Sequence, residues 1–216
     1  MTGHSGRIDA GVHFTMEERA WHAWIEPAGP ETASARQRGA YEGSVWPHSP
    51  YFRLLAWHPD SLAARTALDR AIFLTREGLP RGDRELAATV ASRVNGCELC
   101  ASVHARFTAT FSKDAETVAR LLREGPEAEL DARTQAIVRA AAALTRSPSA
   151  FAGHHVRELR EAGLSDADVY DVIQATAFFA WANRLMLSLG APAAPGEADS
   201  GALADQRAAD RVAAAG

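Results

Sequence analysis

The segment from residue 166 to residue 189, DADVYDVIQATAFFAWANRLMLSL, is the longest stretch of the chain that reads as one uninterrupted helix. Ser165 with Asp168 resembles a capping box at its start, and Gly190 is a typical stop. Its apolar residues form two stripes, one of Val169, Val172, Ile173, Thr176 and Ala180 and one of Phe178, Trp181 and Leu185. A helix that is apolar on several sides lies at the centre of a bundle or is shared with a partner subunit. We therefore expect a helical fold and a homo-oligomer.

The rest of the chain carries the same kind of signals. Capping residues, helical periodicity and Gly or Pro stops divide it into amphipathic segments, and no run of alternating β-branched and aromatic residues predicts a strand. The predicted helices before the last one are 15–25, 49–58, 60–78, 83–94, 97–111, 114–124, 132–145 and 153–162. The pattern predicts an all-α bundle of about eight helices.

Three parts of the chain differ in composition. Residues 1–48 are expected to form an irregular N-terminal arm with a short helix, because much of this part is rich in Gly, Pro and Ser. Residues 49–190 are expected to form one helical domain. Residues 191–216 are rich in Ala, Gly and Pro and have too little apolar bulk to pack, so we expect a flexible tail.

The composition excludes several classes of function. The chain of 216 residues has a net charge of −4, and Lys113 is its only lysine, so we expect no nucleic-acid partner. No signal peptide is recognisable at the N-terminus, and no apolar run reaches the roughly 18 residues of a membrane span. We expect a cytoplasmic protein without a membrane partner. In that compartment a pair of cysteines two residues apart is more often catalytic or metal-binding than a stable bridge.

Both cysteines of the chain lie in the stretch NGCELCASVHARF, residues 95–107. Asn95-Gly96 ends one predicted helix, and Cys97 and Cys100 fall at the start of the next, where the helix N-terminus favours a thiolate. His104 follows Cys100 by four residues and shares its face of the helix. This spacing provides a nucleophile, a second thiol and a base.

Glu85 is expected to join this group. If helices 83–94 and 97–111 fold back on each other at Asn95-Gly96, Glu85 comes level with residue 106, within one turn of His104. The carboxylate would then orient the imidazole, and the imidazole would take the proton from Cys100. Cys100 would attack, and Cys97 would resolve the product as a disulfide.

The stretch RELAATVASRVNGCELCASVHARF resembles the alkylhydroperoxidase D (AhpD-like) family of the carboxymuconolactone decarboxylase superfamily. The resemblance rests on the pattern E-x11-C-x2-C-x3-H, and AFFAWANRLMLSLG with Asn183 and Arg184 also resembles the end of peroxidase-related members. It implies an oligomeric helical bundle, commonly a trimer or hexamer, with thiol peroxidase or disulfide reductase activity.

Carried over to this chain, the family pattern assigns four catalytic residues. Cys100 is the thiol that reacts with peroxide, Cys97 is its partner, and His104 and Glu85 form a proton relay. The implied substrate is a small, organic hydroperoxide, and an external dithiol or thiol protein is the reductant. No metal and no cofactor are expected. The protein is expected to form a homo-oligomer (dimer, trimer or hexamer). One position departs from the family, because the best-studied members have a histidine where this chain has Leu99.

Other interpretations of the motif stay open. The cysteines and His104 share a face with Phe107 and Phe111, so they could be apolar core. A structural zinc site is less well supported, because this segment offers three ligands where four are usual. Two other functions also remain: a redox-sensing or partner-binding protein without turnover, and a non-redox carboxymuconolactone decarboxylase-like enzyme.

Overall fold

A computed structural model describes residues 12–193 of the chain. Over these residues it contains nine helices and one small sheet. The helices are α1 (Ala35–Glu42), α2 (Pro50–Leu55), α3 (Pro59–Phe73), α4 (Arg81–Val94), α5 (Glu98–Ser112), α6 (Ala115–Glu124), α7 (Ala132–Thr145), α8 (Gly153–Glu161) and α9 (Asp166–Leu189), and the strands are β1 (Trp21–Ala23) and β2 (Gly190–Pro192). The predicted fold class is confirmed at this level: the described chain is mostly helical.

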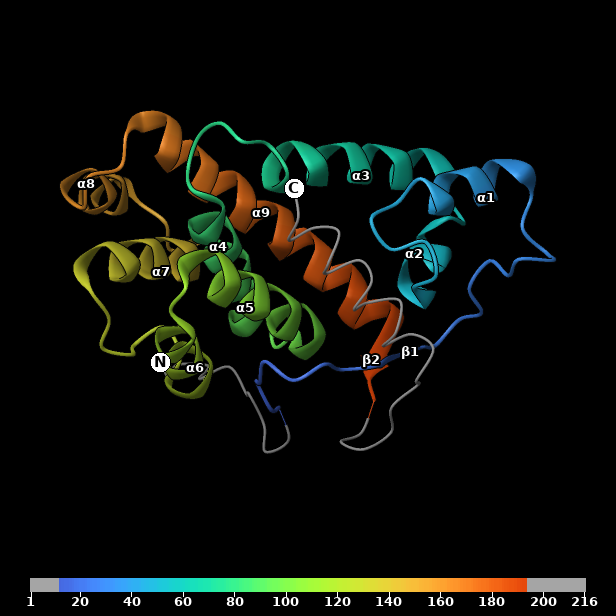
Figure 1. The fold of residues 1–216 in the computed structure, drawn as a ribbon, viewed down its shortest axis with the longest axis horizontal. Coiled ribbons are helices and arrows are strands. Elements are labelled where there is room, and N and C mark those ends of the chain that lie inside the picture. The colour runs from blue at the N-terminus through green and yellow to red at the C-terminus, as the bar shows by residue number, and fades with distance from the viewer. Residues whose placement is uncertain (1–11, 194–216) are drawn as a thin grey trace.

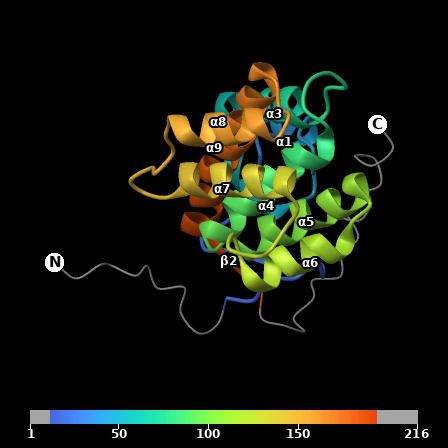
Figure 2. The ribbon, with the colours of Figure 1, turned by 90° about the vertical axis from the view of Figure 1, so that its left-hand side faces the viewer.

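Two helices form the centre of the bundle. α4 packs against α5, α7 and α9, and nearly all its residues from Gly82 to Ser92 are buried. α9 crosses the molecule beside α4, with α3 along one flank and α1 and α2 at the end opposite α6, α7 and α8 (Figure 1). The view from the latter end has α6, α7 and α8 in front (Figure 2). α9 is thus central in the described chain, one of the two positions expected for it, although its Tyr170 and Trp181 are exposed.

The helix predicted over residues 15–25 is wrong. No residue of this segment is helical, and its residues Trp21–Ala23 form β1, which pairs antiparallel with β2 directly after α9. The backbone N–H of Trp24 donates to the carbonyl of Leu189 at 2.8 Å. These are partners more than 160 residues away in sequence, so a local periodicity cannot indicate them, and tertiary pairing overrides the helical pattern.

Three further boundaries differ from the predicted ones. The short helix of the N-terminal part is α1, whose capping box joins Ser34 and Gln37. α3 ends at Phe73 rather than at residue 78, because the Arg84 guanidinium donates to the carbonyls of Ile72 at 2.6 Å and Thr75 at 2.9 Å. Residues 191 and 192 belong to β2, and residues 194–216 of the predicted tail lie outside the described part.

Candidate active site

The turn between α4 and α5 positions the two cysteines. Gly96 has a φ of +77°, a left-handed conformation that glycine adopts without a Cβ clash, and it turns α5 back along α4. Cys97 is the N-cap of α5, and its N–H donates to the Ser92 carbonyl at 2.8 Å. Cys100 lies in the first turn. Both cysteines are unbridged thiols, with 2% and 7% of their surface exposed.

The two thiols form one hydrogen-bonded pair. The bond with Cys100 lowers the pKa of Cys97, against the opposing effect of burial, and Asn183 lowers this pKa further. The same bond, together with burial, raises the pKa of Cys100 well above that of a free thiol. Of the two thiols, Cys97 at the helix N-terminus is therefore the one whose thiolate form is favoured.

Side chains from α9 enclose the pair from the other side. The Asn183 amide is fully buried, donates to Ser92 Oγ at 3.1 Å and accepts from Asn95 Nδ2 at 3.1 Å. The sulfur of Cys100 lies 3.5 Å from the sulfur of Met186. Arg184, the neighbour of Asn183 in the sequence, instead donates to the Ala180 carbonyl at the exposed surface. α9 therefore fixes the dithiol through Asn183 and Met186.

Glu85 and His104 meet across the α4–α5 hairpin. Nδ1 of His104 lies 2.6 Å from Oε2 of Glu85, whose side chain is only 1% exposed. Arg81, four residues earlier on α4, donates from Nε to Oε1 of Glu85 at 3.2 Å. A buried carboxylate needs such partners on both oxygens. The His104 ring also packs edge-on against Phe179 at 3.9 Å between ring centroids. With Nδ1 committed to Glu85, Nε2 is the nitrogen available on the opposite side of the ring.

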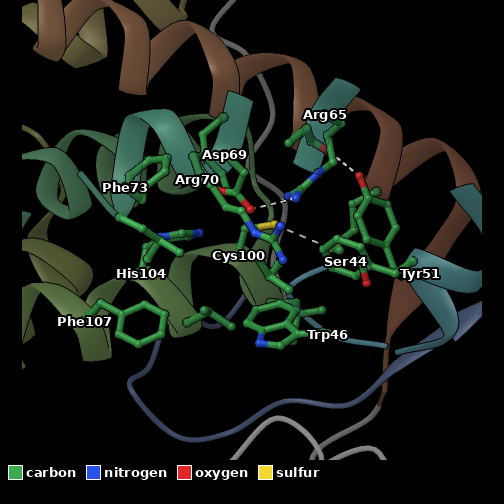
Figure 3. A pocket seen from close by; sticks show the side chains of 18 of the residues that line it. Ser44, Trp46, Tyr51, Arg65, Asp69, Arg70, Phe73, Cys100, His104 and Phe107 are labelled. Carbon is green, nitrogen blue, oxygen red and sulfur yellow. Dashed lines mark hydrogen bonds and ion pairs between the residues drawn. The ribbon is translucent and has the colours of Figure 1, made fainter. Parts of the chain in front are cut away.

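A cavity of about 600 Å³ adjoins these residues, and Cys100, His104 and Glu85 form part of its wall (Figure 3). Cys97 is not among the lining residues. Most of the wall is apolar and includes Trp46, Phe52, Phe73, Phe107, Phe179 and Met186. Leu99, at the position of the family's additional histidine, also lines it. Cys100 is thus the thiol that faces the cavity.

Cys100 and His104 are not connected by a direct hydrogen bond in the described residues 12–193. The Cys100 sulfur contacts Met186, and Nδ1 of His104 contacts Glu85. Both line one cavity, so a water molecule or a substrate oxygen between them would complete the path.

Three further findings bear on the expectations and alternatives raised by the sequence. In the described part of the chain, no cluster of three or more His, Cys, Asp or Glu side chains has an arrangement that could hold a metal ion. Across residues 12–193, no helix is long and apolar enough to cross a membrane. The cavity beside Cys100 distinguishes this cysteine from one packed into solid core.

The structure adds residues that the sequence analysis did not connect with the site. Arg81 precedes Glu85 by four residues, and that spacing on a helix was the available signal. Met186 is one of many apolar residues in α9, so no local signal marked it. At another part of the cavity wall, Arg65 and Asp69 of α3 form an ion pair at 2.7 Å. They too are four residues apart.

Comparisons with known proteins agree with this architecture. Residues 59–125 match the model of the carboxymuconolactone decarboxylase family. An uncharacterized peroxidase-related protein from Ralstonia eutropha JMP134 with an alkylhydroperoxidase AhpD core is 26% identical, covering 64% of this chain and 74% of that one, with a TM-score of 0.58. A peroxidase-related protein from Silicibacter sp. TM1040 is 28% identical, covering 66% and 75%, also with a TM-score of 0.58.

A third structure shares the fold over more of the chain. The debrominase Bmp8 is 17% identical, and the match covers 89% of this chain and 98% of that one with a TM-score of 0.64. No curated protein sequence matches the chain. The resemblance predicted from E-x11-C-x2-C-x3-H is confirmed by the family match and the two peroxidase-related structures.

Proposed function

We propose that this chain, which belongs to the carboxymuconolactone decarboxylase family and has an AhpD-like fold, is a thiol peroxidase that reduces organic hydroperoxides. One observation carries the proposal: Cys100, half of a hydrogen-bonded dithiol, opens into an apolar cavity that also contains the His104–Glu85 pair. A nucleophile, a base and a residue that orients the base then surround one space.

The first step is attack on the hydroperoxide. His104 takes the proton of Cys100, through water or the substrate, and Glu85 holds the imidazole in orientation. The Cys100 thiolate attacks the terminal oxygen of R–O–OH. The S–O bond forms, the O–O bond breaks, and the alkoxide leaves with the proton from His104 as an alcohol. Cys100 is then a sulfenic acid.

The second step closes the disulfide. The Cys97 thiolate attacks the Cys100 sulfur, the S–S bond forms, and the S–O bond breaks to release hydroxide, which takes a proton to become water. The two electrons of the dithiol thus reduce one peroxide. An external dithiol or thiol protein restores both thiols by exchange, and this chemistry calls for no metal or other cofactor. We also propose that the protein works as a homo-oligomer.

A thiol count tests the proposal. Reduced wild-type protein is treated with one equivalent of cumene hydroperoxide, and free thiols are counted before, after, and again after addition of dithiothreitol. We expect two thiols to be lost and both to be recovered. Cys100→Ser should keep its one thiol, whereas Cys97→Ser should form a sulfenic acid on Cys100 that dimedone traps.

Other outcomes select other functions. Thiols that stay reduced in the wild type overturn the peroxidase. Rapid oxidation without turnover, whichever reductant is supplied, indicates a redox sensor. A different result in Cys100→Ser is that Cys97 reacts with the hydroperoxide as fast as the wild-type protein does and is then labelled by dimedone. That result would reverse the assignment of the attacking sulfur. Activity on an organic acid that survives both substitutions indicates a non-redox enzyme of the superfamily.

A further inference from the structure

The cavity has a second polar region that the peroxidase chemistry does not use. Arg65, Asp69 and Arg70, all on α3, also line the cavity, and Arg65 lies on the other side of Cys100 from His104 (Figure 3). Cys100 therefore lies between the relay and the Arg65 guanidinium. A purely apolar substrate would leave this region without a role.

Arg65 is built into the wall rather than extended into solvent. Its side chain is 6% exposed, and its Cζ lies 4.6 Å from the Phe52 ring centroid and 5.2 Å from that of Phe178. Stacked between two rings, the guanidinium keeps one orientation, which reduces the entropy lost when it binds a ligand.

The donors of Arg65 are only partly used. Nη1 donates to Oδ2 of Asp69 at 2.7 Å, while the buried Nε has no hydrogen-bond partner among the described residues. An unpaired buried donor destabilises the folded protein, more so when it is charged. Arg53 and Arg84 also have an unpaired buried Nε, but neither lines the cavity. Arg65 differs from these two because it lines the cavity, so a ligand there can approach the rest of its guanidinium group.

The charges around the cavity favour a monoanion. Its wall contains three arginines, Arg65, Arg70 and Arg81, against two carboxylates, Asp69 and Glu85, which leaves a surplus of one positive charge with histidines neutral. Arg65 pairs with Asp69 and Arg81 pairs with Glu85. Arg70 donates to the carbonyl of Gly43 at 3.0 Å, a neutral acceptor, so its charge is the unbalanced one. One surplus charge suits a carboxylate better than a phosphate dianion.

We propose that Arg65 and Arg70 form a carboxylate-binding subsite, and that the substrate is an amphipathic hydroperoxide whose carbon chain ends in a carboxylate. Guanidinium groups bind carboxylates through paired N–H donors. The apolar and aromatic lining of the same cavity would hold the carbon chain, with the peroxide at the sulfur. The hydroperoxide part rests on the proposed function, whereas carboxylate binding does not.

Calorimetric titration with decanoate tests the subsite, because decanoate carries the carboxylate and chain but no peroxide. Decanol and methyl decanoate serve as uncharged probes of similar length. We expect wild-type protein to bind decanoate about tenfold or more tightly than either, with a preference that falls as salt is raised. Arg65→Gln should abolish the preference and leave decanol binding unchanged. Arg70→Gln, at an exposed position, should reduce it.

Arg139→Gln is the matched control, since Arg139 is exposed on α7 away from the cavity, and it should bind decanoate as the wild type does. Equal wild-type affinities for decanoate and decanol would overturn the subsite. So would an Arg70→Gln protein that keeps the full preference while Arg65→Gln loses binding of both probes alike. Selective decanoate binding by a protein whose thiols ignore hydroperoxides would keep the subsite and overturn the peroxidase.

Discussion

The reactivity of Cys100 depends on a base, because its hydrogen bond to Cys97 and its burial raise its pKa. At neutral pH little of it is thiolate, and the rate of peroxide reduction should rise as pH increases through and above the usual thiol range. Glu85→Gln keeps the volume of the side chain but removes the charge that orients and polarises His104. We predict a rate about 10²-fold lower at neutral pH, since general base catalysis typically contributes that much or more.

The pH profile separates this catalytic effect from a structural one. At alkaline pH hydroxide replaces the relay, so the deficit of Glu85→Gln should shrink. Stopped-flow measurement of thiol loss from neutral to alkaline pH gives the rates of the wild type and of Glu85→Gln. Glu116→Gln is the control, because Glu116 is 88% exposed on α6. A deficit that stays constant at every pH would show that Glu85 only supports the fold.

The proximity of Glu85 and His104 was the most predictable part of the candidate site. Glu85, His104 and the two cysteines lie on two consecutive helices, so one turn at Asn95-Gly96 was enough to predict that Glu85 and His104 are neighbours. Asn183 lies on α9 and Arg65 on α3, so neither belongs to the hairpin that carries the other four residues. Their contacts with the dithiol and the cavity depend on how α9 and α3 pack, which a single sequence does not specify.

At the scale of elements, the turn between α4 and α5 determines where the dithiol lies. Gly96 has a φ of +77°, and a Cβ there would meet no atom within 4 Å. Gly96→Ala should therefore cost only the strain of a left-handed alanine, about 1–2 kcal/mol in the free energy of unfolding. Gly96→Asn should cost less, because asparagine tolerates this conformation. Urea denaturation of the three proteins measures the difference, and equal losses for Ala and Asn would contradict the explanation.

The elements with local signals are those that the sequence predicted well. Asp114, Asp131 and Ser165 accept hydrogen bonds from the first turns of α6, α7 and α9 and mark their starts. The end of α3 and the strand β1 were missed for one shared reason. Arg84 and β2 supply their hydrogen bonds from elsewhere in the fold, so the segments themselves carry no signal.

At the scale of the whole molecule, the β1–β2 pair ties the N-terminal part of the described chain to the end of α9 and covers the core beneath it. Trp21 is 7% exposed and stacks edge-on with Tyr51, with ring centroids 5.8 Å apart. Gly190, opposite Ala23 in the pair, lies directly against the Trp21 ring and the His22 carbonyl. The pair thus closes the bundle near Tyr51, which lines the cavity.

Gly190→Ala tests this closure. A Cβ at residue 190 would overlap the Trp21 ring and the His22 carbonyl, and backbone atoms cannot simply rotate away. We predict a loss of about 1–3 kcal/mol, the usual cost of overpacking, together with a change in tryptophan emission as the ring leaves Tyr51. Gly39→Ala in α1 is the matched control, because its Cβ would meet nothing within 4 Å and alanine favours the helix. If both variants melt at the same temperature, the strand pair contributes little to holding the two ends of the bundle together.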